Sequence, residues 1–153
     1  MSDRLGDAVY SAIANTLENM TFLEVGKDLA DARRYPEEEI LSCRLLIHDP
    51  LQGEMYLLMP RPLLQKIAST VYILPEQDLS EKMVLDMLGE LINTIGGLLM
   101  TAYLPQNQTY ALGLPENGVG LPEADFSSMK EWEFQVDDIV FSLTLVGDGF
   151  FQE

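Results

Sequence analysis

The stretch GELINTIGGLLM, residues 89–100, lies in the longest run of helix-period apolar residues in this sequence. It also contains an acid, an amide and three glycines, although each glycine inside a helix costs about 1 kcal/mol relative to alanine. On a helical wheel of about 100° per residue, Asp86, Glu90 and Asn93 fall on one narrow polar stripe. Apolar side chains fill the opposite arc. The pattern predicts a core helix that carries a polar stripe on its outer face.

The residues around this helix predict the rest of the fold. Ser80 is expected to be its N-cap and Pro105 to bound its far end. Apolar spacing predicts an amphipathic helix over residues 3–20, and Pro62 is expected to open a shorter helix over residues 62–72. Strands are predicted at 21–25, 39–49, 53–60 and 109–115. A further pair of strands is predicted in 131–147, with its turn at Asp137 and Asp138. Loops are predicted at 26–39 and 116–128.

This order of elements predicts an α+β fold. We expect a single domain, residues 1–153, with two long helices and a shorter one packed on a largely antiparallel sheet. The chain has 153 residues and 47% hydrophobic content, which is enough for one core.

The charge balance excludes several function classes. The chain has 25 acidic against 9 basic residues, for a net charge of −16. Because nucleic-acid recognition needs a basic face, we expect no nucleic-acid partner, and the same charge disfavours an anionic membrane surface. The chain contains no run of about 18 apolar residues and no start of the signal-peptide type. We therefore expect no membrane association and a cytoplasmic protein.

The chain has one cysteine, Cys43, and one histidine, His48. An internal disulfide is impossible, which fits a reducing compartment. An odd separation places the two residues on opposite faces of a strand, so they would not form a nucleophilic pair. We interpret Cys43 as a buried structural residue, and we expect no metal site on this chain.

The polar stripe has two interpretations. It can be the solvated face of a core helix, or it can be a surface that contacts another macromolecule. Asparagine is a mediocre helix former, and glycine leaves the backbone bare for close approach, so the contact surface is the sharper hypothesis. Its expected contact residues, besides Glu90 and Asn93, are Asp86, the glycines Gly89, Gly96 and Gly97, and the edge residues Met83 and Met100.

The stripe offers a carboxylate and an amide but no nucleophile. An amide can hold a water molecule by donating and accepting hydrogen bonds at once, and a carboxylate can pair with a lysine. Such groups make a poor free-standing enzyme. They make a sensible half of an active site whose other half, including any metal, comes from a partner.

The segment DMLGELINTIGG, residues 86–97, resembles the signature helix of the CheC/CheX/FliY family of response-regulator phosphatases. The family pattern is an acid, then E-x-x-N, then small residues three and four positions after the asparagine. Asp86, Glu90, Asn93, Gly96 and Gly97 match it position by position. The opening helix followed by MTFLEV also resembles the start of CheX-type members. The chain departs from many members at Leu98 and Leu99, where they carry polar residues.

The resemblance implies a mechanism. Asn93 would orient the hydrolytic water at the phosphoaspartate of a CheY-like receiver domain, and Glu90 would pair with the lysine of the receiver's active site. The receiver would hold Mg²⁺, so no cofactor is expected on this chain. Two-site members carry a second E-x-x-N on the first helix, but here Thr16 stands where that glutamate would be, three residues before Asn19. The resemblance therefore implies a single-site, CheX-like protein with a structural Asn19, and a homodimer.

Three functions remain open on the sequence alone. The first is a phosphatase acting on the aspartyl phosphate of a response regulator in chemotaxis or another two-component pathway. The second is a non-catalytic docking module that binds a receiver domain or a flagellar-switch component through the same stripe. The third is a dimeric scaffold that buries the stripe against its own copy. Retention of both Glu90 and Asn93 favours the enzyme, because docking demands neither residue specifically.

Overall fold

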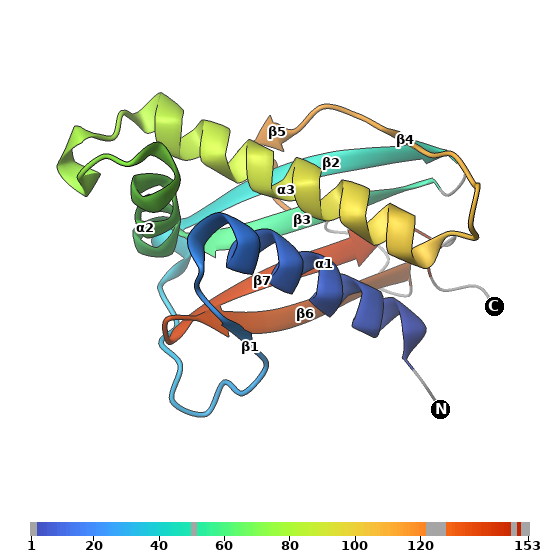
Figure 1. Cartoon of the computed structure of the whole chain (residues 1–153), viewed down its shortest axis with the longest axis horizontal. Helices are drawn as coiled ribbons and strands as arrows, with labels where there is room; N and C mark the ends of the chain where they lie inside the picture. The colour runs from blue at the N-terminus through green and yellow to red at the C-terminus, as the bar shows by residue number, and fades with distance from the viewer. Residues whose placement is uncertain (1–2, 50–51, 122–127, 148–149, 151–153) are drawn as a thin grey trace.

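The computed structural model describes residues 3–49, 52–121, 128–147 and 150. Three helices cover one face of a sheet, as Figure 1 shows. The α+β fold with two long helices and a shorter one is thereby confirmed. The helices are α1 (Arg4–Thr21), α2 (Arg61–Tyr72) and α3 (Glu81–Tyr103), with 3-10 turns at Glu37–Glu39 and Glu76–Asp78.

The sheet has the strand order β1-β6-β7-β3-β2-β4, and β5 pairs with β2 beside β4. Every pair of named strands is antiparallel. The strands are β1 (Val25–Gly26), β2 (Ile40–Asp49), β3 (Gly53–Pro60), β4 (Ala111–Leu112), β5 (Glu116–Asn117), β6 (Met129–Val136) and β7 (Ile139–Val146).

Two hairpins build most of the sheet. Strands β2 and β3 pair along eight positions from Ile40↔Pro60 to Ile47↔Gly53. Strands β6 and β7 are joined by Asp137 and Asp138, which take positive φ angles of 53° and 64°. A two-residue hairpin turn that matches the strand twist needs positive φ at both positions, and aspartate tolerates it. Both hairpins are confirmed, although residues 50–51 of the first turn lie outside the described residues.

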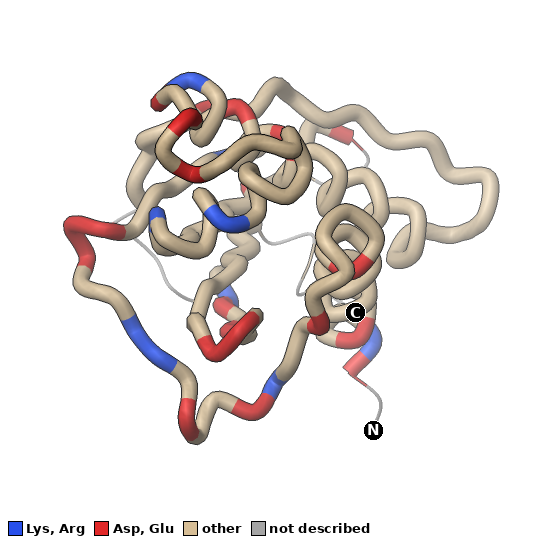
Figure 2. The backbone as a smooth tube through the Cα atoms, turned by 60° about the vertical axis from the view of Figure 1, so that its left-hand side comes forward, with Lys and Arg blue, Asp and Glu red and all other residues tan. Residues whose placement is uncertain are grey.

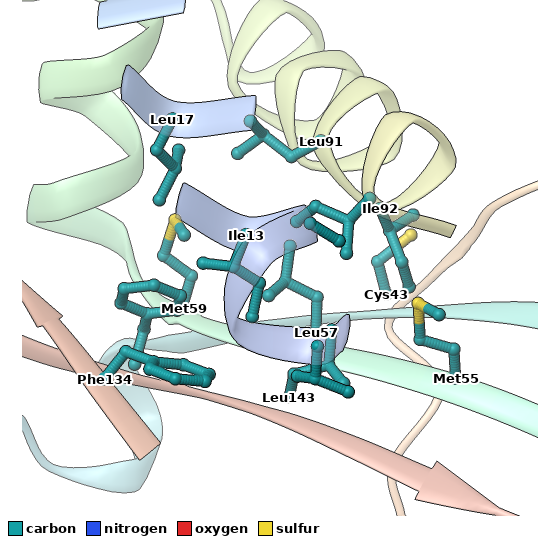
Figure 3. Packing of buried hydrophobic residues seen from close by; sticks show 14 of the residues in the cluster. Ile13, Leu17, Cys43, Met55, Leu57, Met59, Leu91, Ile92, Phe134 and Leu143 are labelled. Carbon is teal, nitrogen blue, oxygen red and sulfur yellow. The ribbon is translucent and has the colours of Figure 1, made fainter. Parts of the chain in front are cut away.

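The core lies between the helices and the sheet (Figure 3). Ile13 and Leu17 from α1 meet Leu91 from α3 above the sheet residues Leu57 and Leu143, and all five are buried. The buried side chains recur at helical spacing on the helices, whereas β7 is buried at six consecutive positions. The periodicity of the sequence therefore decides which face of each helix is buried.

Helix α3 is long and apolar enough to span a membrane by length and composition alone. In the structure most of its apolar residues are buried against α1 and the sheet. The buried residues of α3 are Val84, Met87, Leu88, Leu91, Ile92, Ile95, Gly96, Leu99 and Met100.

Three sequence predictions need correction at their boundaries. The strand predicted at 21–25 begins only at Val25, because α1 continues to Thr21 and Phe22 caps it with a left-handed backbone. The strand predicted at 109–115 is limited to β4, Ala111–Leu112. Glu116–Asn117, predicted as loop, form strand β5 against β2. Of the loop predicted at 116–128, residues 122–127 lie outside the described residues.

Candidate functional site

Helix α3 begins and ends where capping chemistry requires. The Ser80 hydroxyl accepts a hydrogen bond from the Met83 amide at 3.1 Å, which satisfies one of the free N–H groups of the first turn. At the other end, the Leu104 amide still donates to the Met100 carbonyl at 3.0 Å, and Pro105 follows. The predicted N-cap and C-terminal boundary are confirmed. These ends set which residues of α3 face outward.

The polar stripe of α3 faces solvent. Asp86, Glu90 and Asn93 are all exposed, at positions i, i+4 and i+7 of one helix face. The side chains of Glu90 and Asn93 form neither a hydrogen bond nor an ion pair with any other described residue. The two groups are therefore free to meet atoms of another molecule.

The stripe forms the floor of a groove with a volume of about 720 Å³, which we call the α3 groove. The ends of α1 and α2 contribute one wall through Met20, Val71 and Tyr72. The segment 110–117, which we call the strap, contributes the other. The α3 groove is lined by Met20, Val71, Tyr72, Leu85, Asp86, Met87, Gly89, Glu90, Asn93, Leu114, Pro115 and Asn117.

The strap is fixed along its length. Its strands β4 and β5 both pair with β2, and the Gly113 amide donates to the Leu46 carbonyl at 2.8 Å. At its start, the Tyr110 hydroxyl donates to the Gly97 carbonyl of α3 at 3.3 Å. At its end, Arg44 binds both carboxylate oxygens of Glu116 at 3.1 Å. The sequence does not indicate the strap, because only the tertiary fold brings residues 110–117 beside residues 85–97.

The three glycines of α3 have different surroundings. A Cβ at Gly89 would lie 3.4 Å from Pro115 of the strap, and a Cβ at Gly97 would lie 3.6 Å from the Tyr110 hydroxyl. Gly96 is buried, and a Cβ there would lie 2.7 Å from the Leu45 side chain. The expectation that all three glycines clear a contact surface is therefore wrong for Gly96, which lets α3 approach strand β2 closely.

The two methionines at the edges of the stripe also differ. Met83 is half-buried, so part of it is available to another molecule. Met100 is fully buried in the core, and its expected place on the rim is wrong. The wheel angle puts Met100 at the edge of the polar stripe, but the side chain packs in the hydrophobic core.

Charges near the α3 groove are mostly acidic. Lys82 donates to Asp86 across one helical turn at 2.6 Å, and this hydrogen bond and the charge of Asp86 raise the pKa of Lys82. All nine basic side chains of the chain lie in the described part, and each one contacts an acid or an aromatic ring. Arg34, Arg44, Arg61, Lys66, Lys82 and Lys130 form ion pairs, whereas Arg4, Lys27 and Arg33 lie over tyrosine rings.

Acidic positions, by contrast, are spread over helices, loops and strand ends, as Figure 2 shows. Among the described residues, no group of three or more His, Cys, Asp or Glu side chains could hold a metal ion. Cys43 is fully buried, as the sequence predicted, and burial raises its pKa to about 11. A buried, protonated thiol is no nucleophile.

Helix α1 has no equivalent of the α3 stripe. Thr16, which stands where a second glutamate would be, is buried and donates its hydroxyl proton to the Ala12 carbonyl at 2.7 Å. Asn19 is exposed, and its side chain forms no hydrogen bond to another described residue. The expected structural role of Asn19 therefore has no contact to support it, and no glutamate stands three residues before it.

One family of known proteins matches this chain. The family described as "Chemotaxis phosphatase CheX" matches residues 41–121, which is more than half of the chain. This chain belongs to the CheX family, within the wider CheC/CheX/FliY group that the sequence resembled. A search among curated proteins found no significant match.

Solved structures share the fold. The CheX chemotaxis protein of Vibrio vulnificus superposes with a TM-score of 0.73 at 17% identity, covering 93% of this chain and 97% of that one. The CheX of a CheX–CheY–BeF3–Mg²⁺ complex from Borrelia burgdorferi gives 0.68 at 16%, covering 93% and 96%. FliY of Thermotoga maritima gives 0.62 at 13%, covering 99% and 94%. At these identities the likeness shows the fold.

Proposed function

We propose that this protein hydrolyses the aspartyl phosphate of a CheY-like response regulator in chemotaxis or a related two-component pathway. The observation that carries the proposal is the pair Glu90 and Asn93. Both are exposed on the floor of the α3 groove, one helical turn apart, and neither side chain is engaged within the described part of the chain. Membership of the CheX family and the CheX–CheY complex from Borrelia burgdorferi support a receiver domain as the partner.

Asn93 orients the nucleophile in the proposed mechanism. Its carbonyl oxygen accepts a hydrogen bond from a water molecule, and its NH2 group donates to the phosphoryl oxygens or to the same water. The water oxygen attacks phosphorus, the bond between phosphorus and the aspartyl oxygen breaks, and the products are inorganic phosphate and a free aspartate. An amide takes no proton, so Asn93 contributes position rather than base catalysis.

Glu90 holds the partner in register. Its carboxylate, four residues from Asp86 and one turn from Asn93, pairs with the lysine of the receiver's active site. Asp86 is already paired with Lys82, whereas Glu90 has no ion-pair partner among the described residues. The free carboxylate of the stripe is therefore Glu90. Gly89 and the exposed part of Met83 complete the contact that we propose for α3.

The receiver supplies the positive charge that phosphoryl transfer needs. Transition states of this reaction spread negative charge over the phosphoryl oxygens, and cations stabilise them. Among the described residues that line the α3 groove there is no lysine or arginine, so we assign this positive charge to the receiver. We place Mg²⁺ on the receiver, and the Mg²⁺ of the Borrelia complex fits this arrangement.

The proposal includes a cytoplasmic location, because response regulators act there, and a homodimer as the family resemblance implies. Light scattering of the purified protein measures the assembly directly. A dimer in which Glu90 and Asn93 stay accessible agrees with the proposal. A dimer that buries both residues would favour the scaffold function instead.

Phosphate release tests the proposal. Phosphorylated receiver domains of the source organism are incubated with Mg²⁺ and either wild type or Asn93→Ala. We expect faster release with wild type only. Release that is equally fast with Asn93→Ala would overturn the mechanism. Binding of a receiver without faster release by wild type would instead identify a non-catalytic docking module.

A further inference from the structure

We infer that Leu114 of the strap and Ile73 at the end of α2 are apolar anchors that hold the receiver domain over the α3 groove. The inference rests on the proposed function, because it assigns the partner of the same groove. It adds two residues outside the E-x-x-N helix that determine affinity. Neither residue belongs to the polar stripe.

Leu114 is the first observation. Its side chain is 85% exposed and lines the α3 groove on the wall opposite Met20 and Tyr72. The strap around it is tied on both sides, through the Gly113 amide to Leu46 and through Glu116 to Arg44. The exposure of Leu114 is thus a property of an anchored segment. A backbone segment that is already held in place loses little conformational freedom when a partner covers it.

Ile73 is the second observation. It directly follows the groove-lining Tyr72, is 87% exposed, and caps α2 with a φ of 58°. A positive φ is unfavourable for a β-branched residue, and helices commonly place glycine at this position. An isoleucine here is therefore poor both for the backbone and for contact with water. Both costs are offset if a partner buries the side chain.

The acidic character of this chain bears on which interactions can hold a receiver domain at the α3 groove. This chain carries a net charge of −16, and its groove floor contributes Asp86 and Glu90. A phosphorylated aspartate is also anionic, so the phosphoryl group itself is not attracted to these carboxylates. One lysine pairing with Glu90 fixes the orientation of the partner, and we expect burial of apolar side chains to add binding energy beyond that pair. Leu114 lines that groove, Ile73 directly follows its lining residue Tyr72, and both side chains are strongly exposed.

Phe22 offers a matched control. It caps α1 as Ile73 caps α2, with a φ of 64° and 88% exposure. It borders a separate hollow with Leu23, Gln135 and Asp138, and none of the stripe residues lines that hollow. Replacing Phe22 or Ile73 with glycine relieves the same backbone strain. Only the Ile73 variant should change receiver binding.

The test combines binding and turnover for four proteins: wild type, Leu114→Ser, Ile73→Gly and Phe22→Gly. Binding is measured with receiver domains loaded with beryllofluoride and Mg²⁺, and turnover as phosphate release. We expect Leu114→Ser to raise KM and Kd about tenfold, which corresponds to about 1.4 kcal/mol, with kcat unchanged. Ile73→Gly should weaken binding severalfold while raising the melting temperature. Phe22→Gly should raise the melting temperature with wild-type binding.

The outcomes separate this inference from the proposed function. Wild-type KM and Kd in both Leu114→Ser and Ile73→Gly would overturn the anchors and leave the phosphatase intact. Weakened binding in these variants, with no phosphatase activity in wild type, would support the anchors and reject the enzyme. Absence of receiver binding by wild type would overturn both. Binding that weakens steeply as ionic strength rises would also contradict the inference, because it would mean that charge supplies the affinity.

Discussion

Helices α1 and α3 lie side by side on the same face of the sheet, yet only α3 carries a candidate site. The start of α1 meets the end of α3, where Arg4 stacks over Tyr103, so the two helices run in opposite directions (Figure 1). Each helix has an exposed asparagine, Asn93 on α3 and Asn19 on α1, and the E-x-x-N pattern requires a glutamate three residues before it. On α3 that position is the exposed Glu90, and on α1 it is the buried Thr16. The comparison teaches that exposure of both members, rather than the asparagine alone, defines the site.

The largest effect that this comparison predicts belongs to the two asparagines. Asn93→Ala should lower the rate of phosphate release about 100-fold or more, because it removes the group that positions the water. Asn19→Ala should leave the rate unchanged. Both residues are exposed, so both variants should keep the wild-type melting temperature. A rate loss in Asn19→Ala as large as in Asn93→Ala would break the distinction between the helices.

Two adjacent glycines of α3 are expected to have different roles: Gly96 in the packing of the fold and Gly97 in the binding of the receiver. Gly96→Leu should destabilise the fold by about 1–3 kcal/mol in denaturant unfolding, since even its Cβ would lie 2.7 Å from Leu45. A Cβ at position 97 would lie 3.6 Å from the Tyr110 hydroxyl, which is an ordinary contact. Gly97→Leu should therefore change stability by less than about 1 kcal/mol. It should weaken receiver binding, because the larger side chain blocks close approach to α3. Equal stability of the two variants would show that α3 does not need glycine for its approach to β2.

We expect the two carboxylates of the stripe to contribute unequally to receiver binding. Glu90→Gln should weaken receiver binding and the rate about tenfold, the magnitude of one lost charge pair across an interface. Asp86→Asn should have the smaller effect, because Asp86 already pairs with Lys82 at 2.6 Å. Titration calorimetry with a beryllofluoride-loaded receiver measures both. A larger loss of affinity in Asp86→Asn would reverse the assignment of the pairing carboxylate.

The smallest effect concerns the core beneath both helices. Burial raises the pKa of the Cys43 thiol from 9.0 to about 11, so the folded state holds this proton more tightly than the unfolded state. The stabilising contribution is fully present below pH 9 and is lost as pH rises toward 11. Cys43→Ala should flatten the stability profile over that window. Rapid alkylation of native Cys43 at pH 8 would contradict its burial.

Periodicity was sufficient to predict the architecture. Apolar residues at helical spacing predict α1 and α3, Ser80 and Pro105 predict the ends of α3, and two apolar-rich runs on either side of a turn-rich segment predict the first hairpin. These signals are local, so a single sequence carries them. The stripe itself was predictable for the same reason, because Glu90 and Asn93 need only the helix to share a face.

What the sequence could not show depends on contacts between distant segments. Gly96 lies near the edge of the apolar arc on the wheel and Met100 at the edge of the polar stripe, and only the positions of Leu45 and the rest of the core decide that both are buried. The sequence predicts a strand at 109–115 and a loop from residue 116, because nothing in residues 110–117 indicates that they run beside α3. Its two-residue strands are held by pairing to β2, which local propensity does not encode.

The strap also divides the protein into parts that can change independently. The groove floor belongs to α3, whose inner face is fixed in the core, whereas Leu114 sits on a segment tied to the sheet edge. Substitutions at Leu114 or small changes in strap length can alter the fit to a partner without displacing Glu90 or Asn93. Gene copies of such a protein can thus diverge in the regulator they recognise while keeping one chemistry, which limits crosstalk between parallel signalling pathways.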